Sequence, residues 1–372
     1  MLLLVLCFDS RTLNEHSLYI RTVKPVSLYV DFKKKCENFY LDVSFEAGSD
    51  VLGLLGASGS GKSTILKCIA GTDIPDEGKI ILNDETLFDS TRRIKLPPKK
   101  RKVGYLFQNY ALLPSMNVRQ NILSGVHDKK DKAEKESAVD EISDILKLSE
   151  LENNLPHELS KHQQQKVALA RILAGNPDIL LLDEPLSALD THLRGQLQVD
   201  IQKLIKHFGK SALIATHSRD EAYSLCNRIA LVEDGRILAL KDTKALFSNP
   251  ESRHAALLTG CKNVIDARKT GERELTIPAW GVKLTTALPL RDGLCAIAIR
   301  AHYFNAKTSH NRYPVHFVGR MEEPFEYILQ FRYESQDASS PDIWWRLPKD
   351  KIGDSEPREL GIAPQNVLPL YE

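Results

Sequence analysis

Residues 56–64 read Gly-Ala-Ser-Gly-Ser-Gly-Lys-Ser-Thr, which fits the phosphate-loop pattern of a glycine, four residues and then Gly-Lys-Ser. An apolar run at residues 51–55 precedes the loop and is typical of a buried strand, and apolar residues at helical spacing follow it. Glycines let successive backbone N–H groups point at one anion, and a helix N-terminus adds partial positive charge. This stretch therefore predicts a strand, a phosphate-binding loop and a helix.

Two residues of the loop have specific expected roles. Lys62 would reach the β- and γ-phosphates of a nucleotide, and the Ser63 hydroxyl would ligate Mg²⁺. The alternative is an ordinary Gly/Ser-rich turn before a helix. It does not account for the fit of both the loop pattern and its strand–loop–helix context. The residues predicted to bind the nucleotide are Gly56, Ala57, Ser58, Gly59, Ser60, Gly61, Lys62, Ser63 and Thr64.

Length and composition bound the class of protein. The chain has 372 residues, which suggests two or three domains, and its formal net charge of +1 does not favour a nucleic-acid partner. The six cysteines contain no C-x-x-C pair, which argues against a zinc site or a disulfide framework and fits a reducing cytosol. No apolar run approaches the ~18 residues that are needed to span a bilayer.

The chain begins with a short apolar stretch, MLLLVLC. It lacks a basic region and a small-residue cleavage site, so it is a poor signal peptide. We interpret residues 1–26 as an N-terminal extension. The alternative is a membrane-touching anchor, although so short an apolar run binds lipid weakly.

Strand-like and helix-like segments alternate through residues 27–250, which predicts an α/β domain with a parallel sheet. Helical periodicity within about residues 110–175 predicts a helical subdomain. A basic run at residues 95–103 is interpreted as a solvated loop, with a polyanion-binding patch as the alternative. Residues 262–372 alternate short strand-like runs with turn residues, which predicts a small all-β barrel or sandwich.

Polar residues close three of the predicted strands. The apolar run 179–182 ends in Asp183 and Glu184. A carboxylate at a strand tip can hold the hydration shell of Mg²⁺, which suits Asp183, and Glu184 suits the general base that activates a water. Gln108 and His217 close two further strands, where open α/β sheets place ligand contacts. A lone Gln or His is usually a surface residue, but this clustering at strand ends favours a functional role.

Taken together, the motifs resemble those of the ATP-binding cassette (ABC) ATPase family, specifically the nucleotide-binding subunit of a bacterial importer. The phosphate loop resembles its Walker A motif, residues 180–185 (LLLDEP) its Walker B, residues 106–108 (LFQ) its Q-loop, and residues 187–190 (SALD) its D-loop. Residues 215–218 (ATHS) resemble the switch histidine, and residues 159–171 the signature segment. The resemblance covers about residues 27–250.

The resemblance implies a P-loop NTPase fold and an ATPase that works as a head-to-tail homodimer. Two ATP molecules with Mg²⁺ would lie between the Walker A loop of one subunit and the signature segment of the other. Closure and hydrolysis would drive transmembrane permease subunits, which places the protein on the cytoplasmic face of the cell membrane, with a solute-binding protein as an indirect partner. Gln108 would sense Mg²⁺ and the γ-phosphate, and residues 109–114 would help to form the groove that receives the permease. His217 would organise the attacking water, and Asp190 would bridge the dimer interface.

The signature segment departs from the family pattern, Leu-Ser-Gly-Gly-Gln. Ser160 and Gln163 match it, whereas Lys161 and His162 replace the two glycines. Glycine lets backbone N–H groups approach a phosphate closely, so these side chains would crowd the γ-phosphate and weaken closure. Alternatively, the charge of Lys161 would partly compensate. We expect slow but real hydrolysis, because Glu184 and His217 are present.

An aromatic side chain that stacks on adenine would increase the affinity for ATP. Such stacking depends little on which base is bound. Phe32 lies at about the right distance before the loop, and Tyr40 is the second candidate. For either residue, a place in the core of a strand is the alternative.

Residues 296–304 resemble a strand of the accessory barrels (TOBE/MOP-like) found in importers of oxyanions, sugars, polyamines and iron. This implies a regulatory or dimer-stabilising module over residues 262–372. Within these importers the chain looks most like the molybdate, tungstate and sulfate branch, with polyamine, iron or sugar as alternatives. The sequence contains no feature that reads the solute.

The sequence also bears on two alternative functions. A soluble ABC protein of DNA repair or translation would have paired cassettes or a long coiled-coil insertion, and the sequence has neither. An ATP-binding regulatory subunit, with weak hydrolysis because of the altered signature, is the other alternative.

Overall fold

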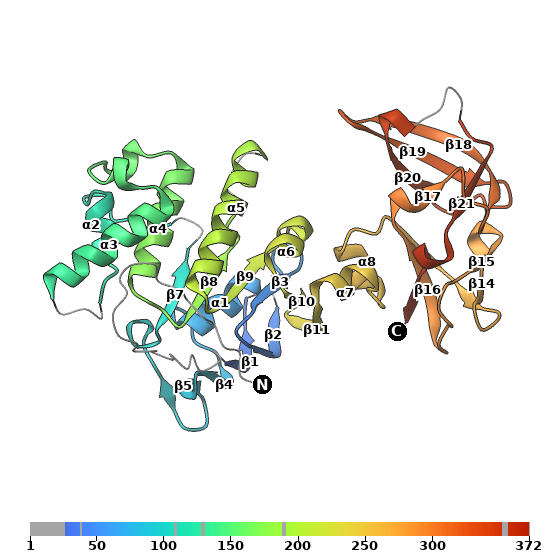
Figure 1. The fold of residues 1–372 in the computed structure, drawn as a ribbon. Helices are drawn as coiled ribbons and strands as arrows, with labels where there is room; N and C mark the ends of the chain where they lie inside the picture. Colours follow the sequence, from blue (N-terminus) through green and yellow to red (C-terminus); the bar gives the residue numbers. More distant parts are fainter. Residues whose placement is uncertain are drawn as a thin grey trace, which may run out of the picture.

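The structure is a computed structural model, and it describes residues 27–37, 39–107, 110–127, 131–187, 191–351 and 356–371. Two bodies lie side by side in it, an α/β part and a smaller all-β part, joined through α7 and α8 (Figure 1). The predicted N-terminal extension, residues 1–26, lies outside the described residues. No helix in the described ranges is long and apolar enough to cross a membrane.

The α/β part is built on an eleven-stranded sheet in the order β6-β5-β4-β1-β2-β11-β10-β3-β9-β8-β7. Neighbours from β10 to β7 pair in parallel, and β11 also pairs in parallel with β2. The pairs β1–β2, β1–β4, β4–β5, β5–β6 and β10–β11 are antiparallel. The strands are β1 (Leu28–Lys35), β2 (Tyr40–Ala47), β3 (Val51–Leu55), β4 (Glu77–Leu82), β5 (Glu85–Asp89), β6 (Ile94–Lys95), β7 (Val103–Leu106), β8 (Ile179–Asp183), β9 (Ser211–Thr216), β10 (Arg228–Glu233) and β11 (Arg236–Asp242).

The predicted parallel sheet is therefore confirmed for the five neighbouring strands from β10 to β7 and for the pair β11–β2, and the whole sheet is mixed. The reason is the length of the connections. Parallel pairing needs a crossover of a dozen or more residues, which the helical segments supply between β3, β7, β8 and β9. Short turns join β1 to β2, β4 to β5 and β5 to β6, so these pairs are antiparallel.

Helices cover both faces of the sheet, as its fully buried central strands require. The first helix packs in a core on one face, while α4, α5 and α6 contribute to the core on the other. The helices are α1 (Lys62–Ala70), α2 (Val118–Leu123), α3 (Lys132–Leu146), α4 (Lys161–Ala174), α5 (Thr191–Phe208), α6 (Arg219–Leu225), α7 (Thr243–Ser248) and α8 (Arg253–Leu258).

Helices α2, α3 and α4 lie together at the end of the molecule farthest from the all-β part (Figure 1). Arg119 of α2 ties this group together, because its guanidinium contacts Glu136 at 2.6 Å, Asp140 at 2.7 Å and Glu152 at 2.9 Å. These three carboxylates raise the pKa of Arg119, although burial opposes the shift. The group carries the signature segment at the start of α4.

The all-β part contains a sheet of β12-β16-β22, one of β13-β14-β15 and one of β17-β21-β18-β19-β20, as expected for a small β domain. Side chains from all three sheets form one core around Leu329, Phe331 and Tyr333. The strands are β12 (Asn263–Asp266), β13 (Arg268–Lys269), β14 (Glu274–Ile277), β15 (Val282–Thr285), β16 (Leu294–Ile299), β17 (Phe304–Asn305), β18 (Tyr313–Glu322), β19 (Glu326–Tyr333), β20 (Ile343–Pro348), β21 (Glu359–Ile362) and β22 (Leu368–Tyr371).

Candidate nucleotide site

The phosphate loop lies between β3 and α1, as its sequence predicts. Gly56 approaches the neighbouring strand so closely that a Cβ atom there would lie 2.1 Å from the carbonyl oxygen of Val232. Gly61 caps α1 with φ of 101°, in the left-handed region that favours glycine. The chain can therefore turn sharply from strand to helix and present backbone N–H groups and the α1 N-terminus to an anion.

Lys62 folds back onto this loop. Its Nζ atom donates to the carbonyl oxygens of Gly56 at 3.0 Å and Ala57 at 2.7 Å, and to Ser60 Oγ at 3.2 Å. Only 4% of the residue is exposed. Burial lowers the pKa of Lys62, and the nearby carboxylates of Glu184 and Asp183 oppose that shift. The loop thus holds an ammonium group where phosphate oxygens would need it.

Ser63 and Asp183 bring oxygen atoms together beside the loop. The Ser63 hydroxyl donates to Asp183 Oδ1 at 2.8 Å, and the Tyr105 hydroxyl donates to Asp183 Oδ2 at 3.0 Å. Burial raises the pKa of Tyr105, as does the adjacent carboxylate, so the phenol stays protonated as a donor. Hydroxyl and carboxylate oxygens are the hard ligands that Mg²⁺ prefers, so this pair fits the ion.

The described residues contain no group of three or more His, Cys, Asp or Glu that could hold a metal ion by itself. Mg²⁺ commonly binds through one or two protein groups together with substrate phosphates, which agrees with a site of two oxygen ligands. Tyr105 was not identified from the sequence. Its position in β7, which pairs in parallel with β8, decides its contact with Asp183.

Glu184 and His217 meet at the ends of β8 and β9. The His217 Nδ1 atom lies 3.0 Å from Glu184 Oε1. Glu184 has φ of 47°, and its backbone N–H donates to the carbonyl oxygen of Ala215 at 2.9 Å, which holds the turn after β8 against β9. The His217 side chain is about half exposed, at 52%. A carboxylate and an imidazole in contact at a strand edge can together hold and deprotonate a water.

The four signature residues stand at the start of α4. Ser160 caps the helix by accepting from the Gln163 N–H at 3.3 Å, and Gln163 Oε1 accepts in return from the Ser160 N–H at 2.8 Å. Lys161 is exposed. His162 points to α5, where its Nε2 atom lies 3.6 Å from Asp200 Oδ2. Burial lowers the pKa of His162, as does the neighbouring Lys166, while Asp200 opposes the shift.

The expected stacking role of Phe32 is wrong, because its side chain is 1% exposed and lies in the core. Alternate residues of β1 face that core, and Phe32 falls on the inward face with Leu28 and Val30. Tyr40 is 48% exposed. The aromatic ring beside the loop belongs to Phe39, whose Cε2 atom would lie 3.0 Å from a Cβ atom on Gly61. No sequence pattern distinguishes Phe39 from its neighbours.

Two predicted residues, Gln108 and Asp190, lie outside the described residues. The fully buried Gln165 of α4 was not predicted. Its Nε2 atom donates to the Pro185 carbonyl oxygen at 2.5 Å, and its Oε1 atom accepts from the Tyr110 hydroxyl at 3.1 Å. Helix α4 therefore connects the turn after Asp183–Glu184 with the segment after β7.

Comparison with known proteins places this geometry in a family. The ABC transporter family profile matches residues 40–187. A spermidine/putrescine import ATP-binding protein of Nitrosomonas europaea is 38% identical over 263 residues, which cover 68% of this chain and 69% of that protein. The chain belongs to the ABC transporter family of ATP-binding proteins. The expected P-loop fold of this family is thereby confirmed.

Other relatives of this ABC protein carry different solute names. An Fe(3+) ions import ATP-binding protein of Haemophilus influenzae is 39% identical over 233 residues, 62% of this chain and 66% of the relative. A sulfate/thiosulfate import ATP-binding protein of Chromobacterium violaceum is 39% identical over 241 residues, 65% of this chain and 64% of the relative. The ABC protein thus aligns with slightly less than two thirds of these two relatives.

Among solved structures, cbiO1 from Clostridium perfringens, described as part of the ABC transporter complex cbiONQ, superimposes with a TM-score of 0.52. It is 26% identical in sequence, and the match covers 60% of this ABC protein and 91% of that chain.

Proposed function

We propose that this ABC protein is the ATP-hydrolysing subunit of a bacterial importer. The observation that carries the proposal is the contact of Glu184 with His217 at 3.0 Å, beside a loop that buries the ammonium group of Lys62. A phosphate cradle alone binds a nucleotide. A carboxylate oriented by an imidazole at the same strand edge adds the means to activate water.

Each side chain has a defined task in this proposal. The loop N–H groups and Lys62 bind the phosphates, with Lys62 exchanging its carbonyl partners for phosphate oxygens. Ser63 and Asp183 hold Mg²⁺, with Tyr105 orienting the Asp183 carboxylate. Bound Mg²⁺ supplies charge neutralisation at the phosphate oxygens during transfer. Glu184 accepts the proton of the attacking water, and His217 orients Glu184.

The importer role rests on the printed names of the relatives and on the order of the motifs. We propose that residues 27–250 are the ATPase domain, with a helical subdomain at about residues 110–175, and that residues 262–372 are an accessory domain. Two copies close on ATP. Residues Ser160–Gln163 of one copy face the ATP bound by the other copy, and Asp190 bridges the interface between them. Gln108 senses Mg²⁺ and the γ-phosphate. The dimer works on permease subunits at the cytoplasmic face of the membrane, together with a solute-binding protein.

For the solute we propose molybdate, tungstate or sulfate. One relative is named for sulfate/thiosulfate, while others are named for Fe(3+) ions and for spermidine/putrescine, which are the alternatives. Uptake of radiolabelled molybdate and sulfate by cells with and without the gene tests this choice. Loss of spermidine or iron uptake alone would overturn it.

A second candidate is an ATP-binding regulatory subunit, which the Lys161 and His162 side chains in the signature segment favour. Steady-state release of phosphate by the purified chain with Mg²⁺–ATP separates the two. We expect vanadate-sensitive turnover that Lys62→Ala lowers about 100-fold or more, since it removes a charge aimed at the transferred phosphate. The matched control Lys67→Ala changes an exposed lysine of the same helix and should keep full activity. Absence of turnover with retained ATP binding would favour the regulatory subunit.

A further inference from the structure

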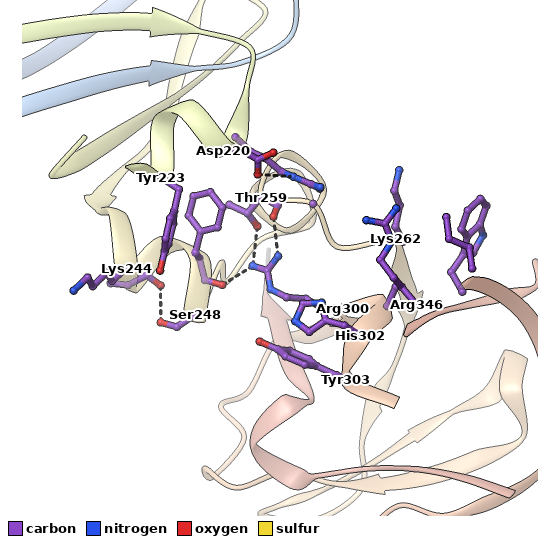
Figure 2. Close-up of a pocket in the computed structure, with 17 residues that line it drawn as sticks. Asp220, Tyr223, Lys244, Ser248, Thr259, Lys262, Arg300, His302, Tyr303 and Arg346 are labelled. Carbon is purple, nitrogen blue, oxygen red and sulfur yellow. Dashed lines mark hydrogen bonds and ion pairs between the residues drawn. The ribbon is translucent and has the colours of Figure 1, made fainter. Parts of the chain in front are cut away.

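A cavity of about 770 Å³ lies where the α/β part meets the all-β part. One wall comes from α6 and α7. The other comes from β19, β20 and residues 300–303, which follow β16, and residues 259–262 lie between the two walls (Figure 2). The volume is in the range of small-molecule sites, about 300–1,000 Å³. The nucleotide site described above uses none of these residues.

The cavity is strongly cationic. Its lining contains five Lys or Arg side chains and a single carboxylate, that of Asp220. Asp220 is already beside a cation, because its Oδ1 atom lies 3.5 Å from Arg219 Nε. Arg346 is paired with Glu323 at 3.1 Å and with Glu326 at 3.4 Å. The charges of Arg219 and Arg346 are therefore largely compensated by protein groups.

Three cations of the lining have no such compensation. The Arg300 guanidinium donates to the carbonyl oxygens of Thr259 at 2.7 Å and Phe247 at 2.5 Å, which are uncharged. Lys244 and Lys262 are exposed and take part in no ion pair with the described residues. Arg300 follows β16 and Lys262 belongs to the linker, whereas the Lys244 side chain on α7 extends away from both of them (Figure 2). The uncompensated charge that faces the cavity therefore comes from Arg300 and Lys262.

Aromatic rings line the same space. Tyr223 and Phe247 pack edge to face with centroids 4.9 Å apart, and the Arg300 guanidinium lies 5.8 Å from the Phe247 ring centroid. Tyr303 and Trp344 line the β side. Tyr223 is 51% exposed, so its ring is available for contact. Ring faces beside uncompensated cations are suited to a ligand with a flat apolar body and an anionic group.

We propose that this cavity binds a small organic anion that carries a planar ring, and that the ligand bridges the α/β part and the all-β part. A carboxylate, sulfonate or phosphate of the ligand would lie beside Lys262 and Arg300. The ring would contact Tyr223 on one part and Trp344 on the other. Binding itself does not depend on the proposed ATPase function.

The cavity is also linked to the catalytic edge of the sheet. Helix α6 begins at Arg219, two residues after His217, and Ser218 caps it by accepting from the Glu221 N–H. Arg219 in turn lies against the linker, because a Cβ atom on Gly260 would be only 1.8 Å from its Nη1 atom. A ligand that fixes α6 against the β side would therefore act on the helix that follows His217.

Calorimetric titration of the full chain with naphthalene-2-sulfonate tests the proposal. We expect 1:1 binding with a Kd below about 1 mM. Lys262→Gln should weaken it about 10-fold, since an attractive charge is lost. The control Lys283→Gln changes an exposed lysine outside the cavity and should leave the affinity unchanged.

Two further probes separate charge from shape. Naphthalene-2-sulfonamide has the ring without the charge, and inorganic sulfate has the charge without the ring. Each should bind about 10-fold more weakly than the sulfonate. Hydrogen exchange with the sulfonate bound should slow at α6–α7 and also at residues 300–303. Equal affinity of the sulfonate for Lys262→Gln and the parent, equal affinity of the parent for sulfate and the sulfonate, or protection on one part only would overturn the proposal.

Discussion

The imidazole Nδ1 of His217 lies 3.0 Å from Oε1 of Glu184, although 33 residues separate them in the chain. The contact exists because β8 and β9 are neighbouring parallel strands that end at the same edge. It orients the Glu184 carboxylate, which is 21% exposed, in the turn after β8. Glu184 can then act as a base in a fixed direction, with His217 as its positioning residue.

Replacement of Glu184 by glutamine should abolish turnover while nucleotide still binds. The amide keeps the shape but cannot accept a proton, so we expect kcat to fall about 10²–10⁴-fold. Phosphate release and equilibrium binding of a fluorescent ATP analogue measure the two effects. Glu150→Gln, an exposed carboxylate elsewhere, serves as the control. A variant with kcat close to that of the parent would remove Glu184 from the mechanism.

Glycines at positions 161 and 162 should raise ATP turnover. The backbone would then approach the γ-phosphate without side chains in the way. Because His162 points to Asp200 on α5 while Lys161 is exposed, Lys161→Gly alone should give most of the gain. Each glycine costs about 1 kcal/mol of helix stability, so thermal unfolding is measured beside kcat. Unchanged or lower activity in the double variant, with folding intact, would contradict the crowding explanation.

Protonation of Glu221 should make the stability of the α/β part depend on pH. Burial raises the pKa of Glu221 to about 7, against the opposing hydrogen bond from Thr216. The folded chain then holds this proton more tightly than the unfolded chain, whose pKa is near 4.5. Stability from this group is complete below the unfolded pKa and is lost as the pH rises to about 7.

Urea unfolding at pH 5 and pH 7.5 measures the effect. The parent should lose about 2 kcal/mol of unfolding free energy relative to Glu221→Gln over this range. Asp220→Asn, at the exposed neighbouring position, should follow the parent. Parallel pH profiles of the parent and Glu221→Gln would mean that Glu221 is ionised in the fold throughout.

Phe39 should contribute to ATP affinity through its ring. It is half-buried beside Gly61, at the entrance of the phosphate loop. Loss of one stacking contact is worth about 1–3 kcal/mol, so Phe39→Ala should weaken ATP binding about 5-fold or more. Phe39→Tyr should retain it, and the control Tyr40→Ala should have little effect. A loss of affinity in Tyr40→Ala, with unchanged affinity in Phe39→Ala, would assign the contact to Tyr40.

The sequence by itself determined the parts of this protein that work through local backbone conformation. The spacing of Gly56, Gly61 and Lys62 specifies a loop that turns tightly into a helix, whatever surrounds it. The apolar run before Asp183 likewise specifies a strand that ends in carboxylates. Strand, loop and helix order then sufficed to predict an α/β nucleotide-binding domain followed by a β domain.

Only the tertiary structure decided which distant residues meet. The strand order put Tyr105 on Asp183 and Gln165 between Pro185 and Tyr110, and no local pattern encodes these contacts. The alternation of β1 buried Phe32 and left Phe39 at the loop. The antiparallel half of the sheet and the cationic cavity between the two parts also arise from packing. They depend on contacts between segments far apart in the chain, which short-range periodicity does not record.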